Sequence, residues 1–253
     1  MRGSRLNALL SGHRSPSAAF PAGARMLALA LLLAGCHKPA PNETRTPLGF
    51  PEAARPVAKL VSGSWSNEPD RDRKGEAEAV MRAADVRPGM TVADIGAGEG
   101  YYTIRLAARV GPKGRVLAED IVPLFHDRLA DRVYRDGLDN VSVKLGKPVD
   151  PGLPEGSFDR IFMVHMYHEI QQPYEFLWNL RPSLAPGGMV VVVDADRPTQ
   201  EHGTPSSLLD CEFRQVGYTL VKRKPMPQAG GYLALYKAEG PRPDPRSMHA
   251  CKS

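Results

Sequence analysis

Residues 92–101 combine a short apolar strand, an acidic residue and three glycines at alternate positions in a single turn. Glycine adopts positive φ readily and lets the backbone approach a ligand closely. The helix expected after the turn offers unpaired N–H groups and the positive end of its dipole. The segment therefore predicts a strand, a ligand-binding loop and a helix, with Asp94 as a charged partner for the ligand.

The spacing of these glycines narrows the choice of ligand. A dinucleotide site has the pattern Gly-x-Gly-x-x-Gly, whereas here the third glycine, Gly100, comes one residue early and Tyr101 occupies its place. A P-loop would need Gly-Lys-Ser/Thr, which does not follow this turn. A pyrophosphate site is therefore disfavoured, and with it a nicotinamide-dependent oxidoreductase.

Strand and helix patterns alternate along the central part of the chain. We expect strands at residues 91–95, 115–119, 141–145, 160–164, 189–195, 218–222 and 232–237. Helices are expected at residues 75–84 and after Pro173 and Thr204. This alternation predicts an α/β fold with a doubly wound, mainly parallel sheet of seven strands, covered on both faces. The short connection at residues 224–231 suits an antiparallel pair at one edge.

Four motifs resemble those of class I S-adenosylmethionine-dependent methyltransferases, and they occur in the same order. Residues 94–100 (Asp-x-Gly-x-Gly-x-Gly) resemble motif I, and Asp120 resembles the acid that takes the ribose hydroxyls at the end of the second strand. Residues 153–161 resemble the entry to the fourth strand, and residues 180–188 the helix and turn before the fifth. The resemblance covers about residues 57–238 and implies a Rossmann-like, class I methyltransferase fold.

The cofactor that the resemblance implies is S-adenosylmethionine, whose ammonium, sulfonium and ribose diol suit carboxylates that would repel a pyrophosphate. In the family an acid commonly follows the third strand and contacts the adenine, whereas Lys147 stands here and Asp150 is the candidate in its place. The expected cofactor-binding residues are Asp94, Gly96, Ala97, Gly98, Gly100, Tyr101, Asp120, Ile121 and Asp150.

The chain is more closely similar to a group of predicted, often exported methyltransferases. They share an Arg/Asp-rich segment (residues 70–74 here), a Gly-Tyr-Tyr-Thr (residues 100–103) and a His-x-x-His after the fourth strand. Methyl transfer needs in-line positioning, and a base where the acceptor carries a proton. His165 or His168 is the expected base, with Tyr167 or Glu169 orienting it; the alternative is a histidine that only hydrogen-bonds the backbone.

A metal site built from these histidines and Glu169 lacks a third well-placed ligand in the sequence, so we expect no metal. Trp65 and the charged residues 70–74 either cap the acceptor pocket or form a solvated face. Asp194 and Asp196 line the cleft or cap a turn, and His202 is expected in a loop.

The N-terminal 35 residues read as a signal peptide. Four arginines and no acids precede or flank an apolar run at residues 26–34, so this leader carries most of the formal net charge of +5. Leu33-Ala34-Gly35-Cys36 resembles a bacterial lipobox, which implies lipidation of Cys36 and a place in the cell envelope, at the periplasmic face of the outer membrane. Because the basic residues belong to the leader, we expect no nucleic-acid partner.

The expected domain boundaries follow from these features. Residues 1–35 form the signal peptide, 36–56 a lipidated N-terminus and flexible tether, 57–238 the methyltransferase-like domain, and 239–253 a Pro-rich disordered tail. A disulfide between Cys211 and Cys251 is open to an exported chain, but we expect a buried thiol at Cys211 because Cys251 lies in the tail.

Two functions remain open at this point. The first is a lipid-anchored, monomeric methyltransferase acting on a small-molecule acceptor. The second is a non-catalytic binding or scaffolding lipoprotein on the same fold. The second is kept because S-adenosylmethionine is made in the cytoplasm, and a chain without twin arginines is exported unfolded, without cofactor.

Overall fold

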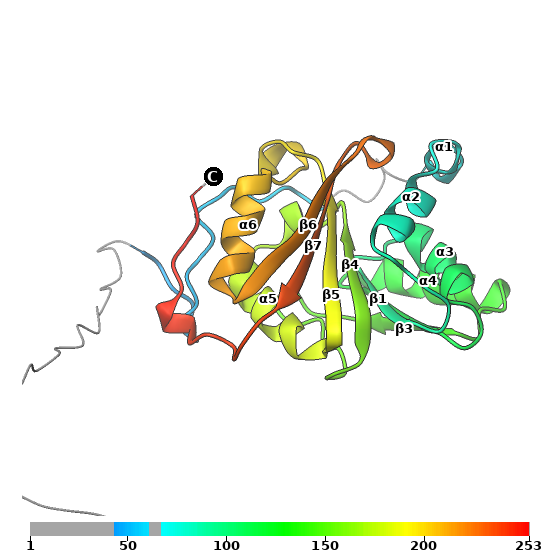
Figure 1. Ribbon diagram of the computed structural model, residues 1–253, viewed down its shortest axis with the longest axis horizontal. Helices are drawn as coiled ribbons and strands as arrows, with labels where there is room; N and C mark the ends of the chain where they lie inside the picture. Colours follow the sequence, from blue (N-terminus) through cyan, green and yellow to red (C-terminus); the bar gives the residue numbers. More distant parts are fainter. Residues whose placement is uncertain (1–42, 61–66, 253) are drawn as a thin grey trace, which may run out of the picture. The chain divides into compact units, whose positions relative to one another are not determined.

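The computed structural model describes residues 43–60 and 67–252, in which seven strands form one sheet of order β3-β2-β1-β4-β5-β7-β6 (Figure 1). The strands are β1 (Thr91–Ile95), β2 (Arg115–Asp120), β3 (Val141–Leu145), β4 (Phe158–Val164), β5 (Leu184–Asp194), β6 (Tyr218–Met226) and β7 (Gly231–Ala238). The first five pair in parallel, and β7 runs antiparallel to both β5 and β6. The predicted fold class, a mainly parallel α/β sheet with an antiparallel pair at one edge, is confirmed.

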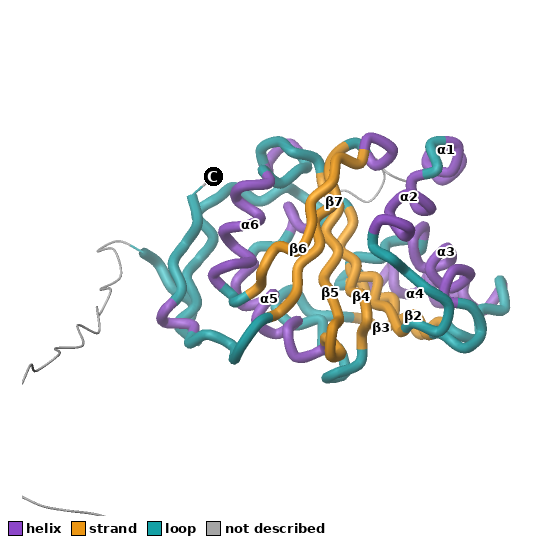
Figure 2. The backbone as a smooth tube through the Cα atoms, in the orientation of Figure 1, coloured by secondary structure: helices purple, strands orange, loops and turns teal. Residues whose placement is uncertain are grey.

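Helices cover both faces of this sheet (Figure 2). They are α1 (Glu68–Arg73), α2 (Glu76–Ala83), α3 (Tyr101–Val110), α4 (Pro123–Arg135), α5 (Pro173–Leu180) and α6 (Ser206–Gln215). Buried side chains of α5 and α6 share one hydrophobic cluster, and those of α2 and α3 share the other. Strand β1 shows the alternation that divides them, because Val92 packs towards α2 and α3 while Ala93 and Ile95 pack towards α5 and α6.

The helix expected after Thr204 is α6, and Thr204 does not cap it. The helix begins at Ser206, whose N–H donates to Asp196 Oδ1 at 2.9 Å, so Asp196 supplies the capping oxygen. The Thr204 hydroxyl instead donates to Asp194 Oδ2, at the end of β5, at 2.7 Å. Both aspartates therefore have structural partners.

The segments on either side of the domain are packed, which corrects the expected tether and tail where they are described. Phe50 is 2% exposed and Met248 is 1% exposed, and both belong to the core cluster under α5 and α6. Ala54 forms a β-bridge with Lys252. The prolines of these segments exclude regular helix, yet the apolar side chains between them are buried like any others. The expected signal peptide, Cys36 and residues 37–42 lie outside the described residues.

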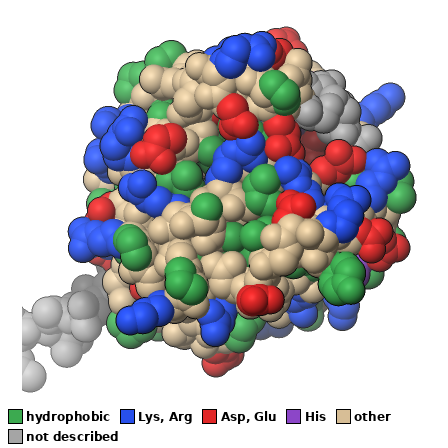
Figure 3. All heavy atoms as spheres, turned by 90° about the vertical axis from the view of Figure 1, so that its right-hand side faces the viewer, with side chains coloured by type: hydrophobic (Ala, Val, Ile, Leu, Met, Phe, Trp, Pro, Cys, Tyr) green, Lys and Arg blue, Asp and Glu red, His purple; other side chains and the backbone are tan. Residues whose placement is uncertain are grey.

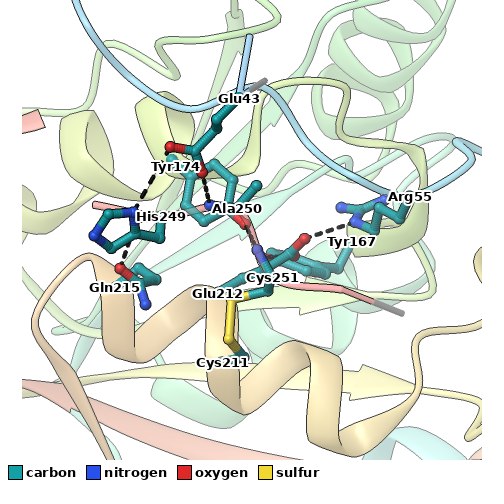
Figure 4. Close-up of a disulfide and its surroundings, with 10 residues drawn as sticks. All are labelled: Glu43, Arg55, Tyr167, Tyr174, Cys211, Glu212, Gln215, His249, Ala250 and Cys251. Atoms are coloured by element: carbon teal, nitrogen blue, oxygen red, sulfur yellow. Dashed lines mark hydrogen bonds and ion pairs between the residues drawn. A yellow bond between two sulfur atoms is a disulfide. The ribbon is translucent and has the colours of Figure 1, made fainter. Parts of the chain in front are cut away.

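A disulfide joins Cys211 of α6 to Cys251, so the expected free thiol at Cys211 is wrong (Figure 4). The Cys251 N–H also donates to the Tyr174 hydroxyl at 2.6 Å, and the Ala250 N–H donates to the Glu43 carboxylate. Sequence spacing could not bring these cysteines together, because only packing of the C-terminal segment against α5 and α6 places them side by side.

Charged side chains are mixed in sign on the face where α1 to α4 lie. Figure 3 shows lysine and arginine interspersed with aspartate and glutamate there. Pairs such as Arg105 with Glu68 and Arg132 with Glu68 connect neighbouring helices on this side. No helix of the described residues has the length and apolar character needed to cross a bilayer.

Candidate active site

A cavity of about 680 Å³ lies at the carboxyl ends of β1, β2 and β4. Ligands of open α/β sheets bind at this edge, where the order of the strands reverses. The volume suits a small-molecule ligand, for which pockets of roughly 300–1,000 Å³ are usual. The sequence-predicted residues that line it are Asp94, Gly96, Ala97, Gly98, Tyr101, Asp120, Ile121, His165 and Glu169.

The glycine loop is held in a shape that only glycine adopts readily. Gly96, Gly98 and Gly100 have φ of 66°, 55° and 89°. A Cβ at Gly98 would meet no atom within 4 Å, so the backbone here faces open space. A Cβ at Gly100 would lie 2.4 Å from a Leu129 methyl carbon. Gly100 does not line the cavity. Because it has no side chain, Leu129 of α4 can pack against the loop at this position.

Two carboxylates at the strand ends hold the loop and the helix α3 that follows it. Asp120 accepts hydrogen bonds from the Gly98 and Val122 N–H groups, both at 2.9 Å. Asp94 accepts one from the Thr103 hydroxyl at 2.6 Å. Burial raises the pKa of Asp94 to about 6, and it raises the pKa of Asp120 against the backbone donors. Both acids therefore stand at the cavity in a desolvated setting.

Glu119 is a cavity residue that sequence reasoning missed. Burial, and then the neighbouring Asp120, raise the pKa of Glu119 to about 8, so this carboxyl holds a proton at neutral pH. Its Oε1 atom is buried and has no hydrogen-bond partner among the described residues. A Cβ at Gly146 would lie 1.3 Å from that atom. The signal in the sequence was an acid within a buried strand, which is uncommon without a partner.

His165 faces the cavity from the loop after β4. Its backbone has φ of 56°, unusual outside glycine, and its N–H donates to the Val193 carbonyl at 2.8 Å. Its Nε2 atom lies 3.7 Å from Glu76 Oε1. His165 therefore lies at the cavity with a carboxylate beside its ring, and its role as a base stays a prediction.

Glu76 is tied into a buried group behind His165. Arg71 donates to both of its carboxylate oxygens, at 2.9 and 2.6 Å, and the Tyr102 hydroxyl donates at 2.9 Å. Burial would raise the pKa of Glu76, but the interactions with His165 and Arg71 outweigh it and lower the pKa to about 2. Glu76 is therefore a carboxylate held beside the imidazole. Arg71 belongs to the charged segment 70–74 that the sequence pointed to, whereas Glu76 was not singled out.

Of the other residues expected to act on the acceptor, one lies at the cavity and two lie away from it. Glu169 lines the cavity, whereas His168 does not, and its Nδ1 atom pairs with Asp194 at 3.0 Å. Tyr167 lies in the core under the sheet, where its hydroxyl donates to Glu212 Oε2 at 2.7 Å (Figure 4). The expected orienting role of Tyr167 is therefore wrong, because successive residues of this turn point to different sides.

Asp150 is also placed away from the cavity. Its carboxylate accepts a hydrogen bond from the Gly152 N–H at 2.8 Å and its backbone bridges to Lys147. The proposed substitute for an adenine-binding acid thus closes a turn instead, while Pro148 lines the cavity nearby. Of the charged residues 70–74, Arg71 reaches the cavity; Trp65 lies outside the described residues.

Comparison with known proteins gives this site its class. Residues 92–188 match the family model of a methyltransferase domain. Nocamycin O-methyltransferase of Saccharothrix syringae is 42% identical over 84 residues, covering 33% of this chain and 30% of that protein. Protein-L-isoaspartate O-methyltransferase of Methanopyrus kandleri is 31% identical over 132 residues, covering 52% of this chain and 56% of that protein. The chain thus spans about a third to just over half the length of these relatives.

Solved structures agree in fold. A methyltransferase from Aquifex aeolicus, described as SAM dependent, matches with a TM-score of 0.59 at 25% identity, covering 64% of this chain and 88% of that one. Together with the glycine loop, these matches define the class of fold: it is the Rossmann-like fold of class I methyltransferases, and residues 92–188 are similar to a methyltransferase domain. A protein named [4+2]-cyclase SpnF shares the fold with a TM-score of 0.57 at 16% identity, covering 74% of this chain and 87% of that one. The reaction must therefore be argued from the site.

Proposed function

We propose that this protein is an S-adenosylmethionine-dependent methyltransferase that acts on a small-molecule acceptor. One observation carries the proposal: a single cavity joins the glycine loop and its two acids to a histidine backed by a buried carboxylate. The first group suits the cofactor, and the second suits removal of a proton from an acceptor.

The residues at the loop fit the cofactor. Open space at the Gly98 Cβ position allows a ligand to approach the backbone. Asp94 and Asp120 offer carboxylates to an ammonium and a ribose diol, and the unpartnered Glu119 Oε1 offers a further polar contact. Burial strengthens each of these interactions relative to water. When bound, S-adenosylmethionine supplies an electrophilic methyl group.

The opposite wall has the features needed to prepare an acceptor. Met166, Ile170 and Phe176 give it an apolar surface that excludes water. His165 accepts the proton of an acceptor hydroxyl, thiol or amine, and the Glu76 carboxylate stabilises the imidazolium that results. Arg71 holds Glu76 in place through a bidentate contact.

The envelope location belongs to the same proposal. Lipidation at Cys36 would anchor the domain to a membrane through its N-terminus, and the described residues begin seven positions later, at Glu43. The Cys211–Cys251 disulfide supports export, because such bonds persist in oxidising compartments and are rare in the cytosol. Labelling cells with a radioactive fatty acid tests the anchor, which a Cys36→Ala substitution should abolish.

Calorimetry of the full chain tests the activity. We expect S-adenosylmethionine to bind and NAD to give no heat. Asp120→Ala should weaken S-adenosylmethionine at least tenfold, whereas Asp150→Ala, the matched control away from the cavity, should bind like wild type. No heat with S-adenosylmethionine would exclude the proposed enzyme. The alternative, a non-catalytic binding or scaffolding lipoprotein on this fold, would then be favoured.

A further inference from the structure

We propose that His168, Glu169 and His202 form a binding site for a divalent transition-metal ion, with Zn²⁺ the best fit. One ligand atom from each side chain lies within 4.8 Å of the other two. The three residues come from two separate segments. His168 and Glu169 belong to the short 3-10 helix Tyr167–Glu169, and His202 follows the 3-10 helix Thr199–Glu201.

Two buried ring nitrogens in this cluster are unaccounted for. His168 is 0% exposed, and its Nε2 atom has no hydrogen-bond partner among the described residues. The buried Nδ1 atom of His202 likewise has no hydrogen-bond partner among the described residues. A buried polar nitrogen without a partner costs free energy, so native proteins pair such atoms or bind something to them. A metal ion satisfies both nitrogens at once.

Asp194 orients the imidazole ring of His168 so that its Nε2 atom can bind a metal ion. Its carboxylate accepts from the Ala195 N–H at 2.9 Å and from the Thr204 hydroxyl at 2.7 Å, which leaves it an acceptor for the His168 Nδ1–H at 3.0 Å. With the proton held on Nδ1, the lone pair of Nε2 points away from Asp194. Metal-binding histidines characteristically donate their other ring N–H to a carboxylate in this way.

The remaining ligand atoms lie within reach. Glu169 Oε1 is 4.0 Å from His168 Nε2. Ligand atoms of a tetrahedral Zn²⁺ site lie about 3.4 Å apart, so the cluster must close by about 1 Å. Glu169 has several rotatable bonds to supply that movement, and it also lines the cavity.

The loop that presents His202 is held firmly. Arg197 donates to the His202 carbonyl at 3.0 Å, and the Thr199 hydroxyl donates to the Pro56 carbonyl at 2.6 Å. His202 itself has φ of 59°, in the left-handed region. Two histidines and one carboxylate are also the donor set of zinc sites that keep a fourth position open for water or substrate. The ion would therefore stand at the margin of the acceptor cavity with one position to spare.

Titration of the full, chelator-treated chain with ZnCl₂ tests the site. We expect one ion per chain by calorimetry and by elemental analysis. His202→Gly removes the imidazole at a backbone angle that glycine adopts freely, so it should fold and bind Zn²⁺ at least tenfold more weakly. His126→Ala, which removes a histidine on α4, should bind like wild type.

X-ray absorption at the zinc edge gives a second readout. We expect two imidazole nitrogens and at least one oxygen in wild type, with one imidazole fewer in His202→Gly. Equal affinity in His202→Gly and wild type, or no Zn²⁺ bound to wild type, would overturn the assignment. Asp120→Ala should lose S-adenosylmethionine and keep Zn²⁺, so the metal site and the proposed activity can fail separately.

Discussion

Breaking the Cys211–Cys251 bridge should cost the protein a large part of its stability. The bridge closes a chain segment of 40 residues. Loop-closure entropy for a segment of that length predicts about 4 kcal/mol of stabilisation, acting through the unfolded chain. Domains typically unfold with about 5–15 kcal/mol, so the loss would be a substantial fraction of the total.

Urea denaturation followed by circular dichroism measures this loss. With an m value of about 2 kcal/mol/M, the midpoint should fall by about 2 M when oxidised wild type is compared with protein in a reducing agent. The double variant Cys211→Ala/Cys251→Ala should resemble reduced wild type. It should also be insensitive to the reducing agent, which controls for any other effect of the reagent.

A midpoint that moves by less than about 0.3 M on reduction would refute the reasoning. It would mean that the bridge does not restrict the unfolded chain as loop-closure entropy requires. Loss of S-adenosylmethionine binding on reduction would contradict it in another way, because no residue from 205 to 252 lines the cavity.

Three substitutions test the site and its charges. Gly98→Ala places a Cβ in open space at φ of 55°, so unfolding free energy should fall by only about 1 kcal/mol while calorimetry shows a larger loss of S-adenosylmethionine affinity. Glu119→Gln should remove a pH dependence of urea stability. The pKa of Glu119 rises from 4.5 to about 8 on folding, so the native state holds the proton and stability falls as pH rises through that window. Glu76→Gln should remove the opposite dependence. The pKa of Glu76 falls from 4.5 to about 2 on folding, so its contribution of about 3 kcal/mol is present above pH 4.5 and lost as pH falls towards 2. A flat wild-type profile would contradict both assignments.

The sequence was sufficient for the sheet because each strand has a local signal. Thr91–Ile95 and Val141–Leu145 are the strands of the structure residue for residue. The antiparallel pair also followed from a short connection that cannot cross over a sheet. Buried strands bounded by turn residues are specified by nearby sequence, so long-range contacts were not needed to find them.

The site was less accessible, because its acceptor side is assembled from distant segments. His165 was found through a local motif, but its partner Glu76 lies 89 positions earlier on α2 and carries no motif of its own. Tyr167 was wrongly predicted to lie at the cavity for a related reason. Its hydroxyl bonds Glu212, which is paired with Arg55 in the core, and no motif near Tyr167 in the sequence indicates that buried ion pair. Sequence proximity placed these residues in one turn, and packing separated them.

The disulfide and the cavity allow compartment and chemistry to be examined independently. Cys211 and Cys251 lie in α6 and the C-terminal segment, whereas the cavity is built from earlier parts of the chain. A bridge that stabilises the domain by several kcal/mol indicates a chain suited to an oxidising compartment. Asp94, Gly98 and Asp120 indicate a chain suited to a cofactor made in the cytoplasm. If oxidised protein binds S-adenosylmethionine as tightly as reduced protein, the oxidised domain is competent, and under the proposed envelope location the supply of the cofactor would be the step that limits activity.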